Sequence, residues 1–473
     1  MSYKENLTEL FENWSGEKMQ TFSPLPESGS PRKYFRIAGA YKTAIGVFNS
    51  DKNENRSFIY LTRHFRKNNL NIPSIYGTDL KNNIYLLEDL GDRTLFSIIE
   101  QSRQKNFKHE DLMLIYKKVI EQLPRFQVIA SKKLDYSNCY PSSKFDKRSM
   151  LRDLNYFKYY FLKLAGVSFD EQKLEDDFNT LANFLLKADC NYFMYRDFNP
   201  RNIMIKEGEP YFIDYQGGRK GALQYDIASF LFSSKADLAH KTREQLLEYY
   251  LVCAKKIKPL NKQLFLKYYY GYLLIRLLQM LGAYGYRGYY EGKAHFLRSI
   301  PYAVKNLDWL LKHHCPGIKT PELLDSLKKI IDSGEFKKFD EETPAGGLTV
   351  RVNSFSYRQK IPADLSGNGG GFVFDCRAIP NPGRIDKYMP LNGRDKPVND
   401  FLDAQEEARL FLKETFELVD KTVENYMDRG WTDLMINYGC TGGQHRSVYC
   451  AEKLAEHLRL KYKINVALNH TRV

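Results

Sequence analysis

Residues 195–204 read YRDFNPRNIM, and the spacing of the polar residues in this stretch is typical of a phosphate-transferring site. Asp197 stands in a loop between two β-rich runs, and Asn202 follows five residues later. Asp214 comes twelve residues after Asn202, in the β-rich run PYFIDY. Phosphoryl transfer needs a carboxylate near the acceptor hydroxyl and metal ligands that hold the phosphates. The ordered trio therefore predicts a kinase with Asp197 as catalytic base and Asn202 and Asp214 as Mg²⁺ ligands, the alternative being a polar loop with chance acids.

Residues 20–330 resemble the aminoglycoside-phosphotransferase-like kinases, whose loop HxDxxxxN corresponds here to YRDFNPRN. The nearest resemblance is to anomeric sugar kinases that act on N-acetylmuramate and N-acetylglucosamine in cell-wall recycling. The shared stretches are SGSPRKYFR (28–36), LLEDLGDRT (86–94), RDFNPRN, IDYQ and YDIAS (225–229). Tyr195 stands where the family has His, a departure that concerns loop support more than chemistry.

This resemblance implies ATP and Mg²⁺ as cofactors and further roles for individual residues. Asp226 would brace the catalytic loop, and Leu87 to Leu90 would form the hinge that offers backbone groups to adenine. The implied ATP-binding residues are Ser28, Gly29, Ser30, Arg32, Arg36, Glu88, Asp89 and Leu90, and the implied substrate residues are Asp153 and Arg196. For Asp153, an exposed helix acid is nearly as good an explanation.

One expected part of the kinase site is missing from the sequence. The β3 lysine should fall within AIGVFN, where Val47 or Phe48 stands instead. The basic turn SGSPRKYFR suggests that Arg36 or Arg32 neutralises the nucleotide phosphates in its place.

A second stretch, NYGCTGGQHRSV at 437–448, has three interpretations. It lacks the GK[ST] of a nucleotide-binding P-loop. As a cysteine phosphatase it has Cys440, five intervening residues, Arg446 and then Ser447. A strand-to-helix position would direct backbone N–H groups at an anion and lower the thiol pKa. The general acid is not obvious, with Asp375 and Asp395 as candidates, and a purely structural turn is the third possibility.

Residues 348–473 resemble the C-terminal domain of RapZ-type proteins through FDCRAIPNPG (374–383), PLNGRDKPV (390–398) and GCTGGQHRSVYCAEKLA (439–455). That resemblance implies a receptor for a sugar phosphate such as glucosamine-6-phosphate, with Cys440 structural and His445 near the anion. The implied site consists of Arg377, Asn381, Cys440, Thr441, Gly442, Gly443, Gln444, His445, Arg446 and Ser447. The resemblance to RapZ also implies two further properties, a role as an adaptor in RNA turnover and self-association. The kinase-like region here replaces the N-terminal half of RapZ, which argues against the RNA role.

The chain of 473 residues is too long for one ordinary core. We expect an α/β protein with a two-lobed, protein-kinase-like N-terminal region and a separate α/β C-terminal domain. The predicted parts are a kinase N-lobe (1–90), a kinase C-lobe (91–332), a linker (333–347) and the C-terminal domain (348–473). The net charge of +14 favours anionic small molecules or a solvated surface over a nucleic-acid face.

Seven scattered cysteines without a CxxC pair predict reduced thiols in a cytoplasmic protein. The N-terminus lacks an apolar signal segment, and Arg276 and Gln279 interrupt the most apolar helical run, so no membrane association is expected. The sequence thus predicts a sugar kinase, on an amino sugar of cell-wall origin, with a sugar-phosphate-binding C-terminal domain. The alternatives are a regulatory RNA-linked adaptor with a vestigial kinase domain and a Cys-dependent phosphatase.

Overall fold

The computed structural model describes residues 2–26, 32–104, 109–339, 347–364, 366 and 370–472. The chain divides into two compact units, one of residues 1–283 with 302–334 and the other of residues 284–301 with 335–473. The predicted α/β class is confirmed, with a mixed kinase-like first unit and a parallel-sheet second unit.

The first unit begins with a small lobe built on a five-stranded antiparallel sheet in the order β1-β2-β3-β5-β4. Its elements are α1 (Tyr3–Ser15), β1 (Thr21–Pro24), β2 (Lys33–Ala38), β3 (Thr43–Phe48), α2 (Lys52–Lys67), β4 (Ile75–Asp79) and β5 (Ile84–Glu88). Ser2 and Glu5 form a capping box at the start of α1, and Leu7 and Phe11 bury against the sheet. The Asp51 side chain caps α2 by accepting from the N–H groups of Asn53 and Glu54.

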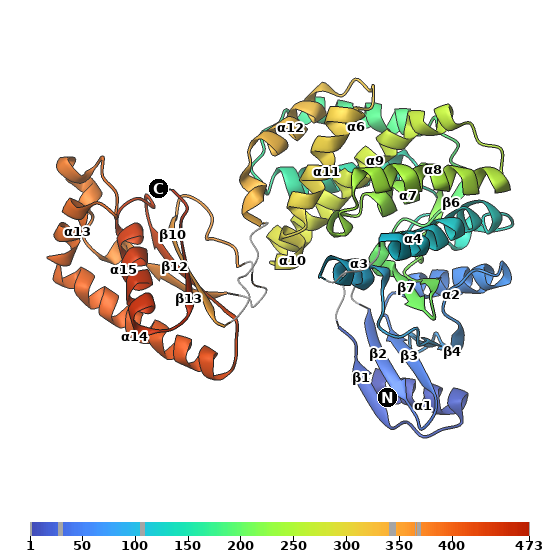
Figure 1. Ribbon diagram of the computed structural model, residues 1–473, viewed down its shortest axis with the longest axis horizontal. Helices are drawn as coiled ribbons and strands as arrows, with labels where there is room; N and C mark the ends of the chain where they lie inside the picture. Colours follow the sequence, from blue (N-terminus) through green and yellow to red (C-terminus); the bar gives the residue numbers. More distant parts are fainter. Residues whose placement is uncertain are drawn as a thin grey trace. The chain divides into compact units, whose positions relative to one another are not determined.

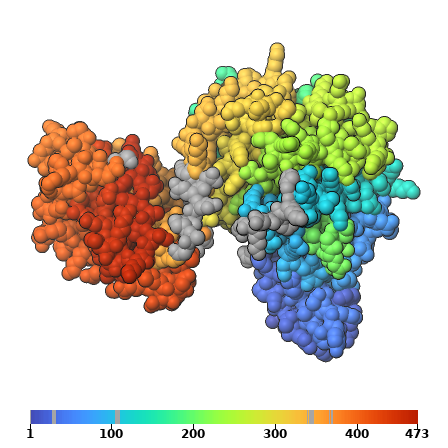
Figure 2. Space-filling view, in the orientation of Figure 1, coloured from blue at the N-terminus to red at the C-terminus, as the bar shows by residue number. Residues whose placement is uncertain are grey.

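The rest of the first unit is a helical lobe, which Figure 1 draws from cyan to yellow beside the blue sheet. Its α-helices are α3 (Leu95–Gln104), α4 (His109–Pro124), α5 (Lys147–Phe157), α6 (Glu171–Leu185), α7 (Gln224–Leu231), α8 (His240–Ile257), α9 (Lys262–Gly285), α11 (Ile300–His313) and α12 (Pro321–Asp332). Two small hairpin-like sheets pair β6 (Tyr192–Met194) with β9 (Arg219–Gly221) and β7 (Ile203–Lys206) with β8 (Glu209–Phe212). The two lobes form one continuous surface in Figure 2.

The second unit contains a four-stranded sheet in which every described pair of strands is parallel, in the order β11-β12-β10-β13. Its strands are β10 (Thr349–Ser356), β11 (Gly371–Asp375), β12 (Asp433–Cys440) and β13 (Asn465–His470), and its helices are α10 (Ala294–Leu297), α13 (Lys396–Asp403), α14 (Glu406–Asp428) and α15 (Arg446–Lys461). The sequence did not predict β13, a half-exposed edge strand. Carboxyl ends of parallel strands meet at one edge of a sheet, and ligands commonly bind there. Ser356, Asp375 and Cys440 end three adjacent strands at that edge.

Within the described ranges, no helix combines the length and the apolar composition that a membrane crossing requires.

Candidate functional site

The loop that carries Asp197 is held by a buried carboxylate. Asp226, in the first turn of α7, accepts hydrogen bonds from the backbone N–H groups of Tyr195 (2.8 Å) and Arg196 (3.0 Å). Burial raises the pKa of Asp226 to about 6, although these hydrogen bonds act in the opposite direction. Arg196 has a φ of 78°, so the backbone turns sharply just before Asp197. The loop-bracing role predicted for Asp226 therefore has a direct geometric basis.

Tyr195 supports the same loop through its side chain. The ring is buried, and its hydroxyl donates to the carbonyl oxygen of Ile213 at 2.6 Å. Because Ile213 immediately precedes Asp214, this bond ties the loop before Asp197 to the segment that carries the second acid.

The predicted metal ligands lie next to each other. Asn202 Nδ2 is 3.2 Å from Asp214 Oδ2 and donates to the backbone oxygen of Asp197 at 2.9 Å. Gln216 Nε2 holds the other carboxylate oxygen of Asp214 at 2.6 Å. The Asp197 side chain is about half exposed, with 48% of its area open to solvent.

Asn202 and Asp214 carry the kinds of ligand atom that a magnesium ion binds. Carboxylate and amide oxygens are ligands that Mg²⁺ accepts, and it commonly binds few protein groups while keeping water and phosphate ligands. The amide nitrogen of Asn202 faces Asp214, and turning the amide over would present its oxygen there instead. Among the described residues, no group of three His, Cys, Asp or Glu side chains is arranged to hold a metal.

Arg32 reaches this site from the start of β2. Its Nη2 lies 3.2 Å from both Asp214 Oδ1 and Glu54 Oε1, and its Nη1 donates to the Tyr34 hydroxyl at 3.0 Å. Asn49 Nδ2 donates to the second oxygen of Glu54 at 2.7 Å. Protein kinases pair a β3 lysine with an αC glutamate; here the buried Arg32 pairs with Glu54 of α2 and also contacts Asp214.

Arg36, the other predicted substitute for the lysine, has different partners. It forms a two-pronged ion pair with Asp89, at 2.7 and 3.1 Å, and also bonds both oxygens of Asp92. These bonds lower the pKa of Asp92. Arg36 thus anchors β2 to the segment that follows β5.

The predicted hinge residues Glu88, Asp89 and Leu90 are fixed by their surroundings. Glu88 Oε1 accepts from Lys206 Nζ at 2.8 Å, and its backbone N–H donates to the oxygen of Ser74 at 2.9 Å. Burial opposes ionisation of Glu88, but the bonds from Lys206 and Ser74 lower its pKa overall. Leu90 is buried. The predicted ATP-binding residues Ser28, Gly29 and Ser30 lie outside the described residues.

The two predicted substrate residues bind each other. Arg196 Nη1 and Nη2 contact the two oxygens of Asp153 at 2.8 and 3.3 Å, and both side chains are buried. Arg196 also donates to the Tyr225 hydroxyl at 2.9 Å. Asp153 of α5 therefore lies against the loop that carries Asp197 and is not an exposed helix acid.

Sequence reasoning missed three residues of this site: Glu54, Gln216 and Arg276. Arg276 of α9 is buried, and its Nη2 lies 3.6 Å from Asp197 Oδ1. The signal for it was present, since a charged residue in the most apolar helical run needs an explanation. An acid in the first turn of the helix after β3 could likewise have indicated Glu54.

The glycine-rich loop of the second unit runs from the end of β12 to the start of α15. Cys440 is buried beneath it; its Sγ accepts from the backbone N–H of Gly443 at 3.2 Å and lies 3.1 Å from Ser447 Oγ. Ser356 Oγ donates to the backbone oxygen of Thr441 at 2.7 Å. A Cβ atom at Gly442 would have no neighbour within 4 Å, so the loop is open at that residue.

Arg446 connects this loop to the segment DCRAIPNPG. Its Nη1 donates to the backbone oxygens of Arg377 (3.2 Å) and Ile379 (3.1 Å), while its Nε is buried without a hydrogen-bond partner. Arg377 itself is exposed and forms an ion pair with Asp375, 2.7 Å from Nη2 to Oδ2. The Arg377 guanidinium lowers the pKa of Asp375, which makes this carboxyl a poor general acid for a phosphatase.

The remaining predicted residues pack the loop against its neighbours. Gln444 Nε2 donates to the oxygen of Leu391 at 2.7 Å, and His445 Nε2 lies 2.9 Å from the oxygen of Tyr388. Asn381 accepts from the N–H of Gly383, whose Cα lies against the His445 ring. The three separate sequence stretches therefore meet at the carboxyl edge of the sheet. Arg472, which the sequence analysis did not identify, also reaches the loop through the oxygen of Gly442 at 3.2 Å.

Comparisons with known proteins assign both units. Residues 21–260 match the phosphotransferase enzyme family, and residues 348–473 match the RapZ C-terminal domain. A nucleotide-binding protein of Fusobacterium nucleatum is 38% identical over 157 residues, covering 32% of this chain and 50% of that protein. A nucleotide-binding protein of Staphylococcus aureus strain JH9 is 33% identical over 149 residues, covering 32% of this chain and 45% of that protein. The chain spans about half the length of the curated relatives it matches.

Among solved structures, the choline kinase LicA from Streptococcus pneumoniae is similar with a TM-score of 0.40 and 13% identity, covering 64% of this chain and 99% of that one. The ethanolamine kinase of Plasmodium vivax is similar with a TM-score of 0.46 and 13% identity, covering 70% and 87%. By the match over half its length, the chain belongs to the phosphotransferase enzyme family, and it carries a RapZ C-terminal domain at residues 348–473.

Proposed function

We propose that the chain is an ATP- and Mg²⁺-dependent kinase that phosphorylates a hydroxyl group of a sugar, an amino sugar of cell-wall recycling. The observation that carries the proposal is the half-exposed Asp197 beside the adjacent pair Asn202 and Asp214. A carboxylate for the acceptor proton and oxygen ligands for a metal are the groups that phosphoryl transfer requires.

In this proposal each residue of the site has one task. Asp197 accepts the proton of the sugar hydroxyl while that oxygen bonds to the terminal phosphorus of ATP and ADP leaves. Asn202 and Asp214 hold Mg²⁺, which neutralises charge on the phosphates when it is bound. Arg32 faces the phosphates, and Asp226 and Tyr195 keep the loop in place. Arg276 lies 3.6 Å from Asp197 and places a positive charge beside that carboxylate.

The test is a screen of hexosamines, their N-acetyl derivatives and muramic acid with ATP, comparing the wild type with Asp197→Asn. Loss of a general base lowers kcat by about 10²- to 10⁴-fold, while the Michaelis constant for ATP should change little. Asp176→Asn, at an exposed position of α6, is the matched control. If the folded wild type turned over none of these sugars, the RNA-linked adaptor role would become the better hypothesis.

For the second unit we propose binding of a sugar phosphate such as glucosamine-6-phosphate at the loop 440–447. The support is the buried Arg446, whose Nε has no partner, at the end of a loop that is open at Gly442. An arginine and free backbone N–H groups at the start of a helix suit a phosphate group. Ligand level would regulate the kinase only if the ligand binds two conformations with different affinity.

Calorimetry with glucosamine-6-phosphate tests this second proposal. Arg446→Ala should weaken binding by about tenfold or more, and Arg429→Ala, at an exposed residue after α14, should leave it unchanged. Cys440→Ser should also retain binding, because Cys440 lies beneath the loop. Equal affinity in Arg446→Ala and the wild type would refute the receptor. Phosphate release that disappears in Cys440→Ser would favour the phosphatase instead.

We further place the protein in the cytoplasm, an assignment that the seven free cysteines support.

A further inference from the structure

One buried arginine of the first unit faces the proposed catalytic base from outside the loop that carries it. Arg276 lies in α9, where its neighbours along the helix, Ile275 and Leu277, are fully buried. Its Nη2 lies 3.6 Å from Oδ1 of Asp197. The Arg276 side chain is 8% exposed, whereas that of Asp197 is 48% exposed. The guanidinium therefore reaches an open site from the interior of the helical lobe.

The polar contacts of Arg276 are incomplete. Its Nη1 donates to Gln279 Oε1 at 2.5 Å, while its Nε is buried without a hydrogen-bond partner. The contact with Asp197 is longer than a hydrogen bond between a guanidinium and a carboxylate. Burial acts to lower the pKa of Arg276, but Tyr225 and Asp197 raise it overall, so the side chain stays charged. A buried cation that is only partly paired is unfavourable and indicates a further anionic partner.

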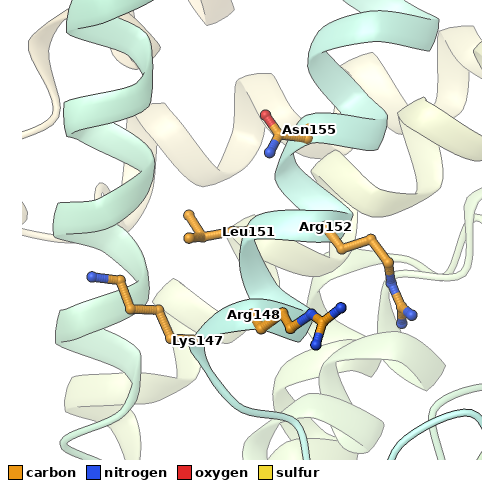
Figure 3. A pocket seen from close by; sticks show the side chains of 5 residues that line it. All are labelled: Lys147, Arg148, Leu151, Arg152 and Asn155. Atoms are coloured by element: carbon orange, nitrogen blue, oxygen red, sulfur yellow. The ribbon is translucent and has the colours of Figure 1, made fainter.

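The other basic side chains near this loop have different surroundings. Arg196 pairs with Asp153 at 2.8 Å. The cations of α5 line a hollow whose walls include neither Asp197 nor Arg276. Among the described residues, Arg276 is the cation that lies within 4 Å of the Asp197 carboxylate. Figure 3 shows the side chains around the α5 hollow, Lys147, Arg148, Leu151, Arg152 and Asn155.

The position of Arg276 suits contact with the phosphoryl group during its transfer. A general base lies about 3 Å from the hydroxyl oxygen whose proton it accepts, and a reacting oxygen starts about 3 Å from the atom that it attacks. The phosphorus would then lie roughly 6 Å from the Asp197 carboxylate. A guanidinium that already lies beside this carboxylate can reach the outer oxygens of the phosphoryl group with its terminal nitrogens.

The charges that change during transfer favour the same contact. When Asp197 takes the acceptor proton it becomes neutral, and Arg276 loses the anion that it faces in the described structure. At this stage negative charge is spread over the three outer oxygens of the transferring phosphoryl group. A cation that bonds these oxygens is bound more strongly in the transition state than in the ground state, which is the condition for raising kcat.

We propose that Arg276 is a catalytic residue that donates hydrogen bonds to the phosphoryl group as it passes from ATP to the acceptor hydroxyl. This inference rests on the proposed kinase function and adds a residue to its site. The bond between the acceptor oxygen and phosphorus forms, the bond between phosphorus and the departing ADP oxygen breaks, and Asp197 takes the acceptor proton. Arg276 keeps its own protons throughout, and Gln279 holds the guanidinium in position.

Binding of a transition-state mimic tests this contact without turnover. Calorimetry of the full chain measures the affinity for ADP with Mg²⁺, in the presence and absence of tetrafluoroaluminate, an anion that mimics the transferring phosphoryl group. The wild type should bind ADP about tenfold or more tightly when the anion is present. Arg276→Gln should lose most of this gain and keep its affinity for ADP alone. Arg276→Lys should retain part of the gain, because it keeps the charge but not the planar set of donors.

Two further variants separate direct contact from an effect through Asp197. Asp197→Asn should keep the gain from tetrafluoroaluminate, because this carboxylate serves the acceptor proton and not the phosphoryl group. If Arg276 acted only by orienting Asp197, the gain would be lost in Asp197→Asn as well. Arg243→Gln is the matched control, since Arg243 is a buried arginine of α8 that donates to Asn306 at 2.8 Å. This control should keep the gain.

Kinetics on a sugar that the wild type phosphorylates give a second measurement. The kcat of Arg276→Gln should fall about 10²- to 10³-fold, with little change in the Michaelis constants for ATP and sugar. A tetrafluoroaluminate gain that is unchanged in Arg276→Gln, lost equally in Asp197→Asn, or absent from a wild type that binds ADP would overturn the inference and leave the kinase in place. An unchanged kcat in Arg276→Gln would do the same. A folded wild type that binds no ADP would instead refute the proposed kinase function.

Discussion

Nη2 of Arg32 lies 3.2 Å from Oδ1 of Asp214. The same nitrogen contacts Glu54 of α2, so one guanidinium connects a helix of the sheet lobe to the proposed metal site. No lysine stands at the corresponding position of β3, where the chain has Val47 and Phe48. Arg32 directly precedes Lys33, which pairs with Phe48 in the sheet, and we propose that Arg32 supplies the missing charge.

Arg32→Ala should therefore lower kcat/KM for ATP by about 10- to 100-fold, the range of one to two charge-assisted hydrogen bonds. Arg32→Lys should recover part of this loss. Arg36→Ala is the matched comparison, since Arg36 is already bonded to Asp89 and Asp92 and should affect ATP much less. Steady-state kinetics at varied ATP concentration distinguish the two arginines. Unchanged kinetics in both variants would remove the arginines from the nucleotide site.

The buried Asp226 predicts a pH-dependent difference in stability. Its pKa rises from 3.8 to about 6 on folding, so the folded chain binds this proton more tightly than the unfolded chain. The resulting stabilisation is complete below about pH 3.8 and is lost as the pH rises through about 6. Asp226→Asn has no such proton, so the advantage of the wild type should shrink by up to about 3 kcal/mol across this window.

Urea unfolding of the wild type and Asp226→Asn at about pH 4.5, 5.5 and 6.5 measures this difference. Asp176→Asn is the control, because that side chain is exposed and should show no comparable trend. The amide introduced by Asp226→Asn has a single acceptor oxygen, whereas the native carboxylate serves the N–H groups of Tyr195 and Arg196 with two. The variant should also have a lower kcat. If the stability advantage of the wild type over Asp226→Asn grew with pH, the predicted direction of the effect would be wrong.

The kinase loop could be predicted from the sequence because its chemistry is local. Asp197 and Asn202 belong to one short loop, and the next strand brings Asp214 beside them. Long arginine side chains were harder to assign, since tertiary packing determines which carboxylate each one reaches. The sequence placed Arg32 and Arg36 in one basic turn, but Arg36 lies in β2 and pairs with Asp89 after β5, whereas Arg32 precedes β2 and contacts Asp214.

The same limit applies to the second unit. Its glycine-rich loop and the two accompanying stretches were recognisable by residue type and order. Arg446, however, directs one nitrogen at backbone oxygens of Arg377 and Ile379, and no side-chain pattern indicates such a contact. Strand β13 was missed because its alternating, half-exposed residues follow a helix with little turn signal.

Tyr195→Phe tests whether loop support is separate from chemistry. The change removes the hydroxyl that donates to the oxygen of Ile213 and should cost about 1 to 2 kcal/mol of unfolding free energy. Because Ile213 precedes Asp214, kcat should fall as well. Tyr272→Phe is the control: its buried hydroxyl donates to the oxygen of Leu185, away from the loop. That variant should lose similar stability and keep its kcat; a normal kcat in Tyr195→Phe would argue against the supporting role.

Substitutions at two adjacent glycines, Gly442 and Gly443, test backbone strain and ligand binding separately in the loop of the second unit. Gly443 has a φ of 70°, and a Cβ there would lie 3.0 Å from both Cβ and N of Ser356. A Cβ at Gly442 would meet nothing within 4 Å, and its φ is not in the left-handed region. Gly443→Ala should therefore lower the unfolding free energy by about 1 to 3 kcal/mol, whereas Gly442→Ala should be nearly neutral.

Thermal unfolding of both glycine variants, followed by calorimetry with glucosamine-6-phosphate, measures the two effects separately. The Gly443 N–H donates to Cys440 Sγ, so a displaced Gly443 also disturbs the buried thiol that supports the loop. Binding should weaken in Gly443→Ala together with stability. In Gly442→Ala stability should be retained, and any loss of affinity would then come from the added methyl group at the open surface of the loop. Equal destabilisation by both substitutions would mean that strain at Gly443 does not shape the loop.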